Sequence, residues 1–198
     1  MTLLTETDYT EQVFKDLDLS HREIVSKEFE DCTFERCDFS ETIFKKCRFL
    51  NCTFTHCDLS LIKIKYSSFV NTVFKHSKII GVNWSEALYK EKDLYSPVKF
   101  FNCVISHSTF IGLKLQKIHI KECVAKDVDF RDSDLSGSDM SHSDFSDSLF
   151  VKTLLGKSDF TGSTNYNINA TLNDIKKAKF SLPEAVSLLY GLDIILVE

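Results

Sequence analysis

Residues that commonly turn a chain are scarce in this sequence. Its 198 residues include only 2 prolines and 6 glycines, although these two residues are common means of reversing direction. A chain with many turns must therefore make them by another device. No apolar run approaches the roughly 20 residues that a membrane-spanning helix needs, so we expect no such helix.

The start of the chain lacks the features of a secretory leader. The opening residues MTLLTETDYTEQ are acidic and have neither a basic start nor an apolar stretch. We therefore expect the protein in the cytoplasm, where its 7 cysteines stay reduced. The formal net charge of −5 argues against a simple basic nucleic-acid-binding protein, and we expect no direct contact with nucleic acid or with a membrane.

Apolar residues recur at every fifth position, a period that fits neither a helix nor an alternating strand. A second register begins at Ile105 and continues through Phe160, fades at Asn165 and Ala170, and returns at Ile175. The first register consists of Phe14, Leu19, Ile24, Phe29, Phe34, Phe39, Phe44, Phe49, Phe54, Leu59, Ile64, Phe69, Phe74, Ile79 and Trp84.

The residue two before the apolar one is often small or of modest size, as in Cys32 and Ser133, and the residue between them is often Asp. This pattern predicts a short extended side with two inward residues, followed by a turn. Four such sides make one coil, and stacked coils pair like parallel strands. Residues twenty apart, such as Phe34, Phe54 and Phe74, should then stack inside the tube, and contacts between neighbouring coils should hold the fold.

The same pattern resembles the pentapeptide-repeat family, whose motif is A(D/N)Lxx. Two segments carry the resemblance most closely, "DCTFERCDFSETIFKKCRFLNCTFTHCDLS" and "DVDFRDSDLSGSDMSHSDFSDSLF". The resemblance covers about residues 12–180. It implies an all-β solenoid, a right-handed quadrilateral β-helix of about eight coils with a short C-terminal helix and strand.

Breaks in the pattern divide the chain. We expect an N-terminal cap or disordered segment at 1–11, a first repeat block at 12–84, a second at 100–180, and a C-terminal helix–strand module at 181–198. The register shifts within 85–99. One inserted residue near Ser96 and Pro97 would suffice, or part of the segment loops out of the wall; we expect a local distortion with a modest protrusion.

The C-terminal module reads as a short helix over 182–190 followed by a strand over 193–197. Ser181 and Glu184 have the spacing of a capping box, and Gly191 would end the helix. The module either shields the end of the tube or forms a homodimer, since an uncovered strand edge favours pairing. The candidate dimer-interface residues are Val186, Leu188, Leu189, Leu192, Ile194 and Ile195.

Catalytic and metal-binding patterns are missing. Every Cys occupies the small inward slot of the repeat, where a free thiol behaves as a small apolar group. The His residues lie one or two positions from an apolar residue and should face water, and no glycine-rich phosphate loop occurs. We therefore predict that the protein is not an enzyme and uses neither a cofactor nor a metal.

Charge divides the chain into segments. Residues 1–31 carry net −6, 32–126 net +7, 127–160 net −5 and 161–198 net −1. The acidic segment either presents an anionic surface to a partner or simply reflects a preference for Asp before the apolar residue. The candidate partner-binding residues are Asp127, Asp129, Asp134, Asp139, Asp144, Asp147 and Asp159.

A narrow rod with regular negative charge is similar to duplex DNA, which carries one charge per ~1.7 Å of axis. Within the pentapeptide-repeat family, the bacterial quinolone-resistance (Qnr) branch consists of dimeric rods thought to mimic DNA and bind type II topoisomerases. The ending "LPEAVSLLYGLDIILVE" looks like theirs. The resemblance implies a homodimer that binds DNA gyrase and possible fluoroquinolone protection; the alternative is a protein-interaction scaffold for an unrelated partner.

Overall fold

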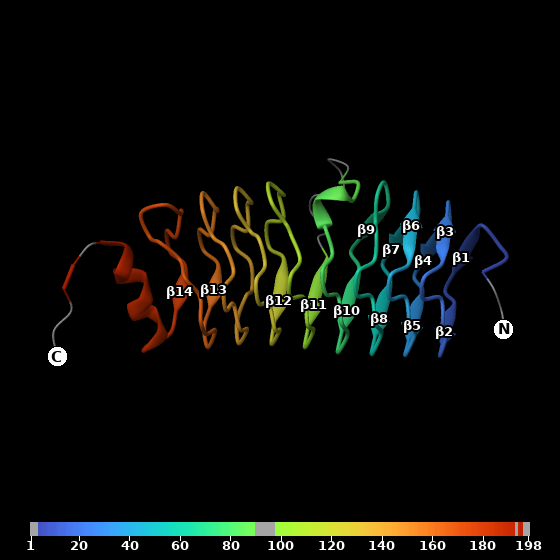
Figure 1. Ribbon diagram of the computed structural model, residues 1–198, viewed down its shortest axis with the longest axis horizontal. Coiled ribbons are helices and arrows are strands. Elements are labelled where there is room, and N and C mark those ends of the chain that lie inside the picture. The colour runs from blue at the N-terminus through green and yellow to red at the C-terminus, as the bar shows by residue number, and fades with distance from the viewer. Residues whose placement is uncertain (1–3, 90–97, 193, 196–198) are drawn as a thin grey trace.

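The protein folds as a rod of stacked coils. The computed structural model describes residues 4–89, 98–192 and 194–195. Figure 1 shows about eight coils in a row, with the N-terminus at one end and a helix at the other. The prediction of an all-β solenoid with a period of five is confirmed. Within the described residues, no helix has the length and apolar character to cross a membrane.

The strands are short and parallel, because each side of a coil contributes only two or three residues before the chain turns. They are β1 (Asp8–Thr10), β2 (Val13–Lys15), β3 (Glu23–Val25), β4 (Glu28–Glu30), β5 (Thr33–Glu35), β6 (Ile43–Lys45), β7 (Arg48–Leu50), β8 (Thr53–Thr55), β9 (Ser68–Val70), β10 (Val73–Lys75), β11 (Lys99–Phe101), β12 (His119–Lys121), β13 (Asp159–Phe160) and β14 (Lys179–Phe180). Two 3₁₀ helices, η1 (Trp84–Glu86) and η3 (Glu184–Leu192), complete the elements described.

Four walls enclose the tube, and we number them in chain order from β2. The first wall contains β2, β5, β8, β10, β11 and β12 in one sheet, and the pair β13–β14 continues it. The second wall is built from isolated bridges such as Asp18 to Asp38. The third wall contains β3 and β6, and the fourth contains β1, β4, β7 and β9. Parallel partners are twenty residues apart, as in the Phe34 to Phe54 pair.

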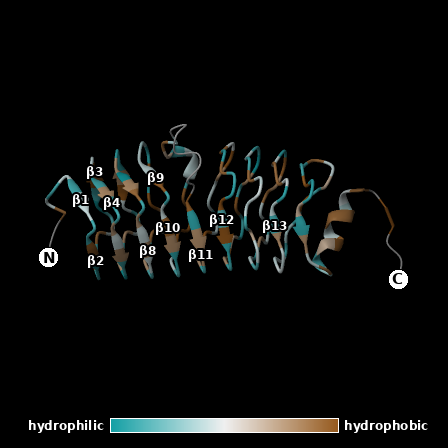
Figure 2. Ribbon diagram, turned by 180° about the vertical axis from the view of Figure 1, so that it is seen from behind, coloured by the Kyte–Doolittle hydropathy of each residue, from teal (hydrophilic) through white to brown (hydrophobic). Residues whose placement is uncertain are grey.

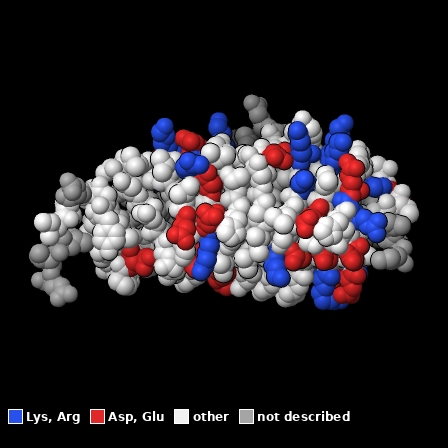
Figure 3. Space-filling view, in the orientation of Figure 1, with Lys and Arg blue, Asp and Glu red and all other residues white. Residues whose placement is uncertain are grey.

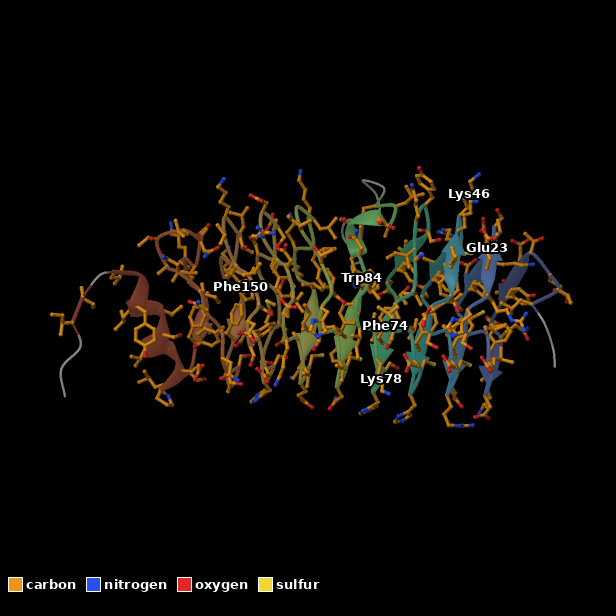
Figure 4. All side chains as sticks on the ribbon, in the orientation of Figure 1. Glu23, Lys46, Phe74, Lys78, Trp84 and Phe150 are labelled. Atoms are coloured by element: carbon orange, nitrogen blue, oxygen red, sulfur yellow. The ribbon has the colours of Figure 1, made fainter. Side chains whose placement is uncertain are left out.

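The core is a set of columns of large side chains that run along the rod. On the first wall, the ring centroids of Phe34 and Phe54 lie 4.6 Å apart, and those of Phe54 and Phe74 lie 5.1 Å apart. All three rings are buried. Figure 4 shows Phe74, Trp84 and Phe150 inside the tube, whereas Lys46 and Lys78 project from opposite edges. The predicted stacking along one interior wall is confirmed.

Many of the small inward slots hold a side chain that donates a hydrogen bond, whereas others, such as those of Ile62 and Val128, hold an apolar side chain. The hydroxyl of Thr42 donates to the carbonyl of Leu19 at 2.7 Å, and Ser143 donates to Ile120 at 2.8 Å. The thiol of Cys47 makes the same contact with Ile24 at 3.2 Å. Since each acceptor lies 23 residues earlier, these bonds link neighbouring coils. All 7 cysteines are free and buried in such slots, which explains their spacing of five.

The turning device is a left-handed backbone conformation at the residue two after each central apolar residue. The non-glycine residues at these corners have φ between 49° and 63°. Most of the glycines, including Gly137 and Gly162, occupy the same corners, with φ near 70°. None of the non-glycine corner residues is β-branched, as expected where a branched Cβ clashes most with the backbone. Repeated left-handed corners therefore replace Pro and Gly turns.

The interruption at 85–99 differs from the one-residue insertion considered from sequence. Val73 pairs with Lys99, a spacing of 26 residues, whereas Thr53 pairs with Val73 at 20. The coil therefore holds six extra residues. The old register persists to Leu88, whose N–H donates to Ser67 at 2.8 Å. The six extra residues lie after Tyr89, because the ladder keeps its usual register up to Leu88 and again from Lys99 onward. Ser96 and Pro97 lie outside the described residues.

A second irregularity lies in the last full coil, where the sequence pattern fades. The third wall advances from Phe150 to Ile168, two residues fewer than usual. Tyr166 and Ile168 are buried in place of Asn165 and Ala170. The amide of Asn173 then fills the next small slot and donates to the carbonyl of Phe150 at 2.9 Å.

The C-terminal helix departs from its predicted details. η3 spans Glu184–Leu192, so Gly191 lies within it and does not end it. The capping box is wrong: the Ser181 hydroxyl accepts from the N–H of Gly162, and the Glu184 carboxylate accepts from the N–H of Asn165. Both side chains thus satisfy donors of the last coil. Of the predicted strand 193–197, the described residues 194 and 195 are not in a strand; the others lie outside the description.

Candidate functional site

The predicted acidic residues lie around the rod and do not form one stripe. Asp139 and Asp159 are direct ladder partners on the first wall. Asp144 lies on the second wall, Asp129 on the third and Asp134 on the fourth. Asp127 and Asp147 occupy neighbouring left-handed corners between the second and third walls. The sequence prediction that spacings of twenty bring these pairs together is correct.

Five of these carboxylates have a local structural task. Asp129, Asp134, Asp139, Asp144 and Asp159 each accept a hydrogen bond from the backbone N–H two residues later, at 2.9–3.1 Å. This Asx turn is a standard use of Asp before a corner. Asn83 and Asn169 make the same contact without a charge. The preference for Asp before the central residue is therefore explained by the fold.

The same five carboxylates are also matched by neighbouring polar groups. Asp129 lies 2.7 Å from the guanidinium of Arg131, and Asp159 lies 2.9 Å from the ammonium of Lys179. Asp144 and Asp139 face Lys126 and Lys121 at 3.1 and 4.0 Å, and Asp134 accepts from Gln116. Their negative charge is thus partly balanced within the rod.

These contacts lower the pKa of three of the carboxylates, those of Asp129, Asp144 and Asp159. Hydrogen bonding to Thr161, together with Lys179, lowers the pKa of Asp159 to about 2. Burial opposes ionisation of Asp144, but hydrogen bonds from Ser146 and Asn165 outweigh it and hold its pKa well below its ordinary value. The guanidinium of Arg131 lowers the pKa of Asp129. Asp129, Asp144 and Asp159 therefore stay ionised well below neutral pH.

Two corner residues present their charge outward. The side chain of Asp127 is 62% exposed, against 29% for Asp159. The carboxylate of Asp127 lies 2.9 Å from the Nδ1 of His107. Asp147 is exposed, and its carboxylate has no hydrogen bond or ion pair within the described part of the chain. Asp132 was not among the predicted residues, but it is also an exposed corner residue, like Asp147. Its place at a corner is the signal that could have identified it.

The histidines follow the same positional logic, with one exception. His21, His56, His76, His107 and His142 are exposed corner residues, as expected. His119 is half-buried on the first wall, beside Phe101, so it faces water only in part. Across the described residues, no group of three or more His, Cys, Asp or Glu side chains is arranged to hold a metal ion.

The C-terminal module covers the last coil with one face and exposes the other. Leu188 packs against the core and Val186 is half-buried. The predicted interface residues Leu189, Leu192, Ile194 and Ile195 are 37%, 44%, 52% and 90% exposed. Figure 2 shows hydrophobic colouring on the C-terminal helix at the end of the rod. Two further exposed apolar residues, Leu182 and Tyr190, were not predicted; both lie in the apolar C-terminal run.

A hollow of about 460 Å³ joins the acidic corner to this module. Asp147 and Asn165 line it from the coils, and Ser187 and Tyr190 line it from η3. The hydroxyl of Ser187 donates to the carbonyl of Tyr166 at 3.4 Å, which holds η3 on the coil. The structure thus places an outward carboxylate beside exposed apolar residues.

Comparisons with known proteins agree with this architecture. Residues 27–110 match the model described as "Pentapeptide repeat region", and 126–162 match "Pentapeptide repeats (8 copies)". No curated protein sequence matches the chain.

QnrB1 and HetL are two proteins of different biology whose solved structures are similar to this fold. A trypsin-treated form of QnrB1, a plasmid-mediated fluoroquinolone resistance protein, is 18% identical, with a TM-score of 0.73 over 96% of this chain and 100% of that one. Another trypsin-treated QnrB1 form is 22% identical, with a TM-score of 0.64 over 96% of this chain and 92% of that one. HetL, involved in heterocyst differentiation regulation in the cyanobacterium Nostoc sp., is 10% identical, with a TM-score of 0.50 over 85% of each chain.

Proposed function

Since this chain belongs to the pentapeptide-repeat family, we propose that it is a non-enzymatic, homodimeric protein that binds a bacterial type II topoisomerase, DNA gyrase or a relative, in the cytoplasm. In this proposal its acidic surface stands in for duplex DNA, and binding protects the enzyme from fluoroquinolones. The observation that carries the proposal is a QnrB1-like rod over 96% of the chain that ends in an outward apolar face.

The outward corner carboxylates support the role of a DNA surrogate. Asp127 and Asp147 are successive members of one corner column, since the Asp127 N–H donates to the carbonyl of Ser146 at 2.8 Å. Neighbouring rungs of parallel strands are about 4.8 Å apart. The column therefore presents closely spaced negative charge on the edge of a narrow rod, as a DNA backbone does. The Asx-turn carboxylates add a background of fixed negative charge.

The exposed apolar face of η3 supports the dimer. Leu189, Leu192 and Ile195 lie on the free end of the rod, where a two-fold partner would cover them. A self-complementary patch of this kind is typical of two-fold dimers. The hollow lined by Asp147 and Tyr190 would then place acidic groups from both protomers near the dimer axis.

DNA supercoiling by purified gyrase, with and without a fluoroquinolone, tests the proposal. We expect the protein at micromolar concentration to inhibit supercoiling alone or to restore it in the presence of the drug. D127K/D147K should abolish the effect. The matched control is E11K/D31K, which makes the same charge change at exposed corners of the opposite end and should act as the wild type. If the wild-type protein shows neither inhibition nor rescue, gyrase binding is rejected.

The second candidate function is a protein-interaction scaffold with another partner. HetL, which shares the fold at a TM-score of 0.50, is described in connection with heterocyst differentiation regulation. A wild-type protein that is folded, dimeric and inert toward gyrase would favour this alternative.

A further inference from the structure

We propose that a trough on the third wall binds single-stranded nucleic acid through its phosphates. The trough is formed by four exposed lysines and one exposed tyrosine on two successive coils. We call it the lysine trough: Lys45, Lys46, Lys63, Lys65 and Tyr66, over a floor of Ile43, Phe44 and Ile62. The proposal is independent of topoisomerase binding.

Like charges lie side by side in the lysine trough. Most ion pairs among the described residues join residues about one coil apart, as in Lys15 with Glu35 and Arg36 with Asp16. On the third wall, Ile43 pairs with Lys63, and this register places Lys45 beside Lys65. Like charges also lie side by side at Asp139 and Asp159, but each of those carboxylates has a lysine partner, at 4.0 and 2.9 Å, whereas the lysines of the trough have few carboxylate partners. Like charges that face each other across a ladder destabilise it. A bound anion would remove this cost.

Few carboxylates neutralise these lysines. Lys45 lies 3.8 Å from Glu23, a long contact between side chains that are each 53% exposed. Lys46, Lys63 and Lys65 form no ion pair with any residue that the structure describes. Figure 3 shows Lys and Arg side chains gathered along the upper edge of the rod over β6 and the following coil, and Figure 4 shows Lys46 projecting there.

The surface between the lysines is hollowed. One hollow of about 350 Å³ is lined by Lys45, Lys65 and Tyr66, and a second of about 590 Å³ is lined by Leu61 and Asn83. The two share Ile43, Lys63 and Glu86 as lining residues, so they form one trough across the wall. η1 rises from the wall at one end, where the N–H of Tyr66 donates to the carbonyl of Glu86 at 3.2 Å.

Tyr66 distinguishes a single strand from other anionic partners. Its side chain is 50% exposed, and the ammonium of Lys65 lies 5.3 Å from the centre of its ring. A basic groove with an aromatic ring beside it is the usual way to bind a single strand, because phosphates contact the lysines while a base stacks on the ring. Glu23, Glu41 and Glu86 also line the two hollows, and Glu86 lines both, which limits the footprint to a few nucleotides.

Fluorescence anisotropy with a labelled oligo-dT of about twelve nucleotides, without topoisomerase, tests this assignment. We expect a dissociation constant in the micromolar range at low salt. The logarithm of the binding constant should fall with the logarithm of salt concentration at a slope of about −2 to −3, as for three or four phosphate contacts on a single strand. Absence of saturable binding at low salt would overturn the proposal.

Two variants localise the binding. K63E/K65E should weaken binding roughly tenfold or more and flatten the salt slope by about 1.4, which corresponds to two lost phosphate contacts. Y66A should weaken binding at least about fivefold through lost stacking and leave the salt slope unchanged. K117E/K157E makes the same charge change at exposed corners between the fourth and first walls and should bind like the wild type. Circular dichroism and urea unfolding verify that each variant is folded.

The remaining outcomes also decide the question. If K117E/K157E weakens binding as much as K63E/K65E, the attraction is diffuse and the trough is not the site. If duplex DNA binds as tightly as oligo-dT and Y66A has no effect, the single-strand assignment is wrong.

Discussion

At the scale of single residues, the rod depends on an unfavourable conformation used many times. A left-handed φ costs an L-residue about 1–2 kcal/mol, yet it recurs at nearly every corner. The non-glycine residues described at these corners are unbranched at Cβ, and glycine occupies several other corners. Each corner tolerates its strain because the adjoining backbone groups pair with the coils on either side. Corner positions should therefore be sensitive to Cβ branching and indifferent to most other changes.

Lys157 provides the test, because it is an exposed corner residue with φ of 63°. K157V should lower the free energy of unfolding by roughly 1 kcal/mol, because a branched Cβ fits the left-handed conformation less well than the Cβ of Lys does. K157G should leave it unchanged or raise it slightly, since glycine adopts this conformation without a steric penalty. Urea unfolding followed by circular dichroism measures both. Equal stability of the two variants would contradict the role assigned to the corners.

At the scale of elements, contacts between rungs link neighbouring coils. Side chains one coil apart pair by charge, as Lys179 does with Asp159, and small inward residues bond to carbonyls of the preceding coil. Asp159 and the other Asx-turn carboxylates also accept a hydrogen bond from the backbone N–H of their own turn. The stability of the last coils should therefore depend on pH in the acid range.

D159N isolates this dependence, because Asn can keep the Asx turn while losing the charge. The folded-state pKa of Asp159, about 2, lies below its ordinary value of 3.8. Its ionised form therefore stabilises the fold above about pH 4, and this contribution is lost as pH falls toward 2. At neutral pH, D159N should be less stable by at most about 1 kcal/mol, since the pair is largely surface-exposed.

The comparison of urea midpoints at neutral pH and near pH 2 measures the effect. The deficit of D159N should shrink in acid. D132N is the control, because the Asp132 carboxylate makes no hydrogen bond within the described residues. A deficit of D159N that stays constant with pH would show that the Lys179 contact contributes nothing.

At the scale of the whole molecule, the two ends of the rod differ. The N-terminal end is acidic, and the C-terminal end has an apolar face of Leu189, Leu192 and Ile195. L189R/L192R should convert a dimer of twice the chain mass to a monomer, measured by size exclusion with light scattering. L149R is the matched control, because Leu149 is 44% exposed on the third wall, far from η3 in sequence. A wild-type protein that is already monomeric would contradict the proposed interface.

The period of five made the fold predictable, because inward residues such as Phe34 and Phe54 repeat without exception over the first block. The length of the inserted segment was not predictable, since residues outside the ladder leave no periodic trace. The sequence located the acidic residues but could not separate Asp159, which caps its own turn, from Asp127, which faces solvent. The lysine trough was hidden in the overall charge, although Lys45 and Lys65 are twenty residues apart.

The six additional residues between Tyr89 and Val98 have a practical consequence. The ladder resumes unchanged after them, with Phe74 facing Phe100 at a centroid distance of 5.2 Å, so six extra residues are accommodated here without a change in the stacking. Foreign sequence, such as a short affinity tag or a fluorophore-binding peptide, could be spliced there without altering the stacking on either side. Such a graft would mark one edge of the rod and allow its orientation on a large enzyme to be seen directly by electron microscopy.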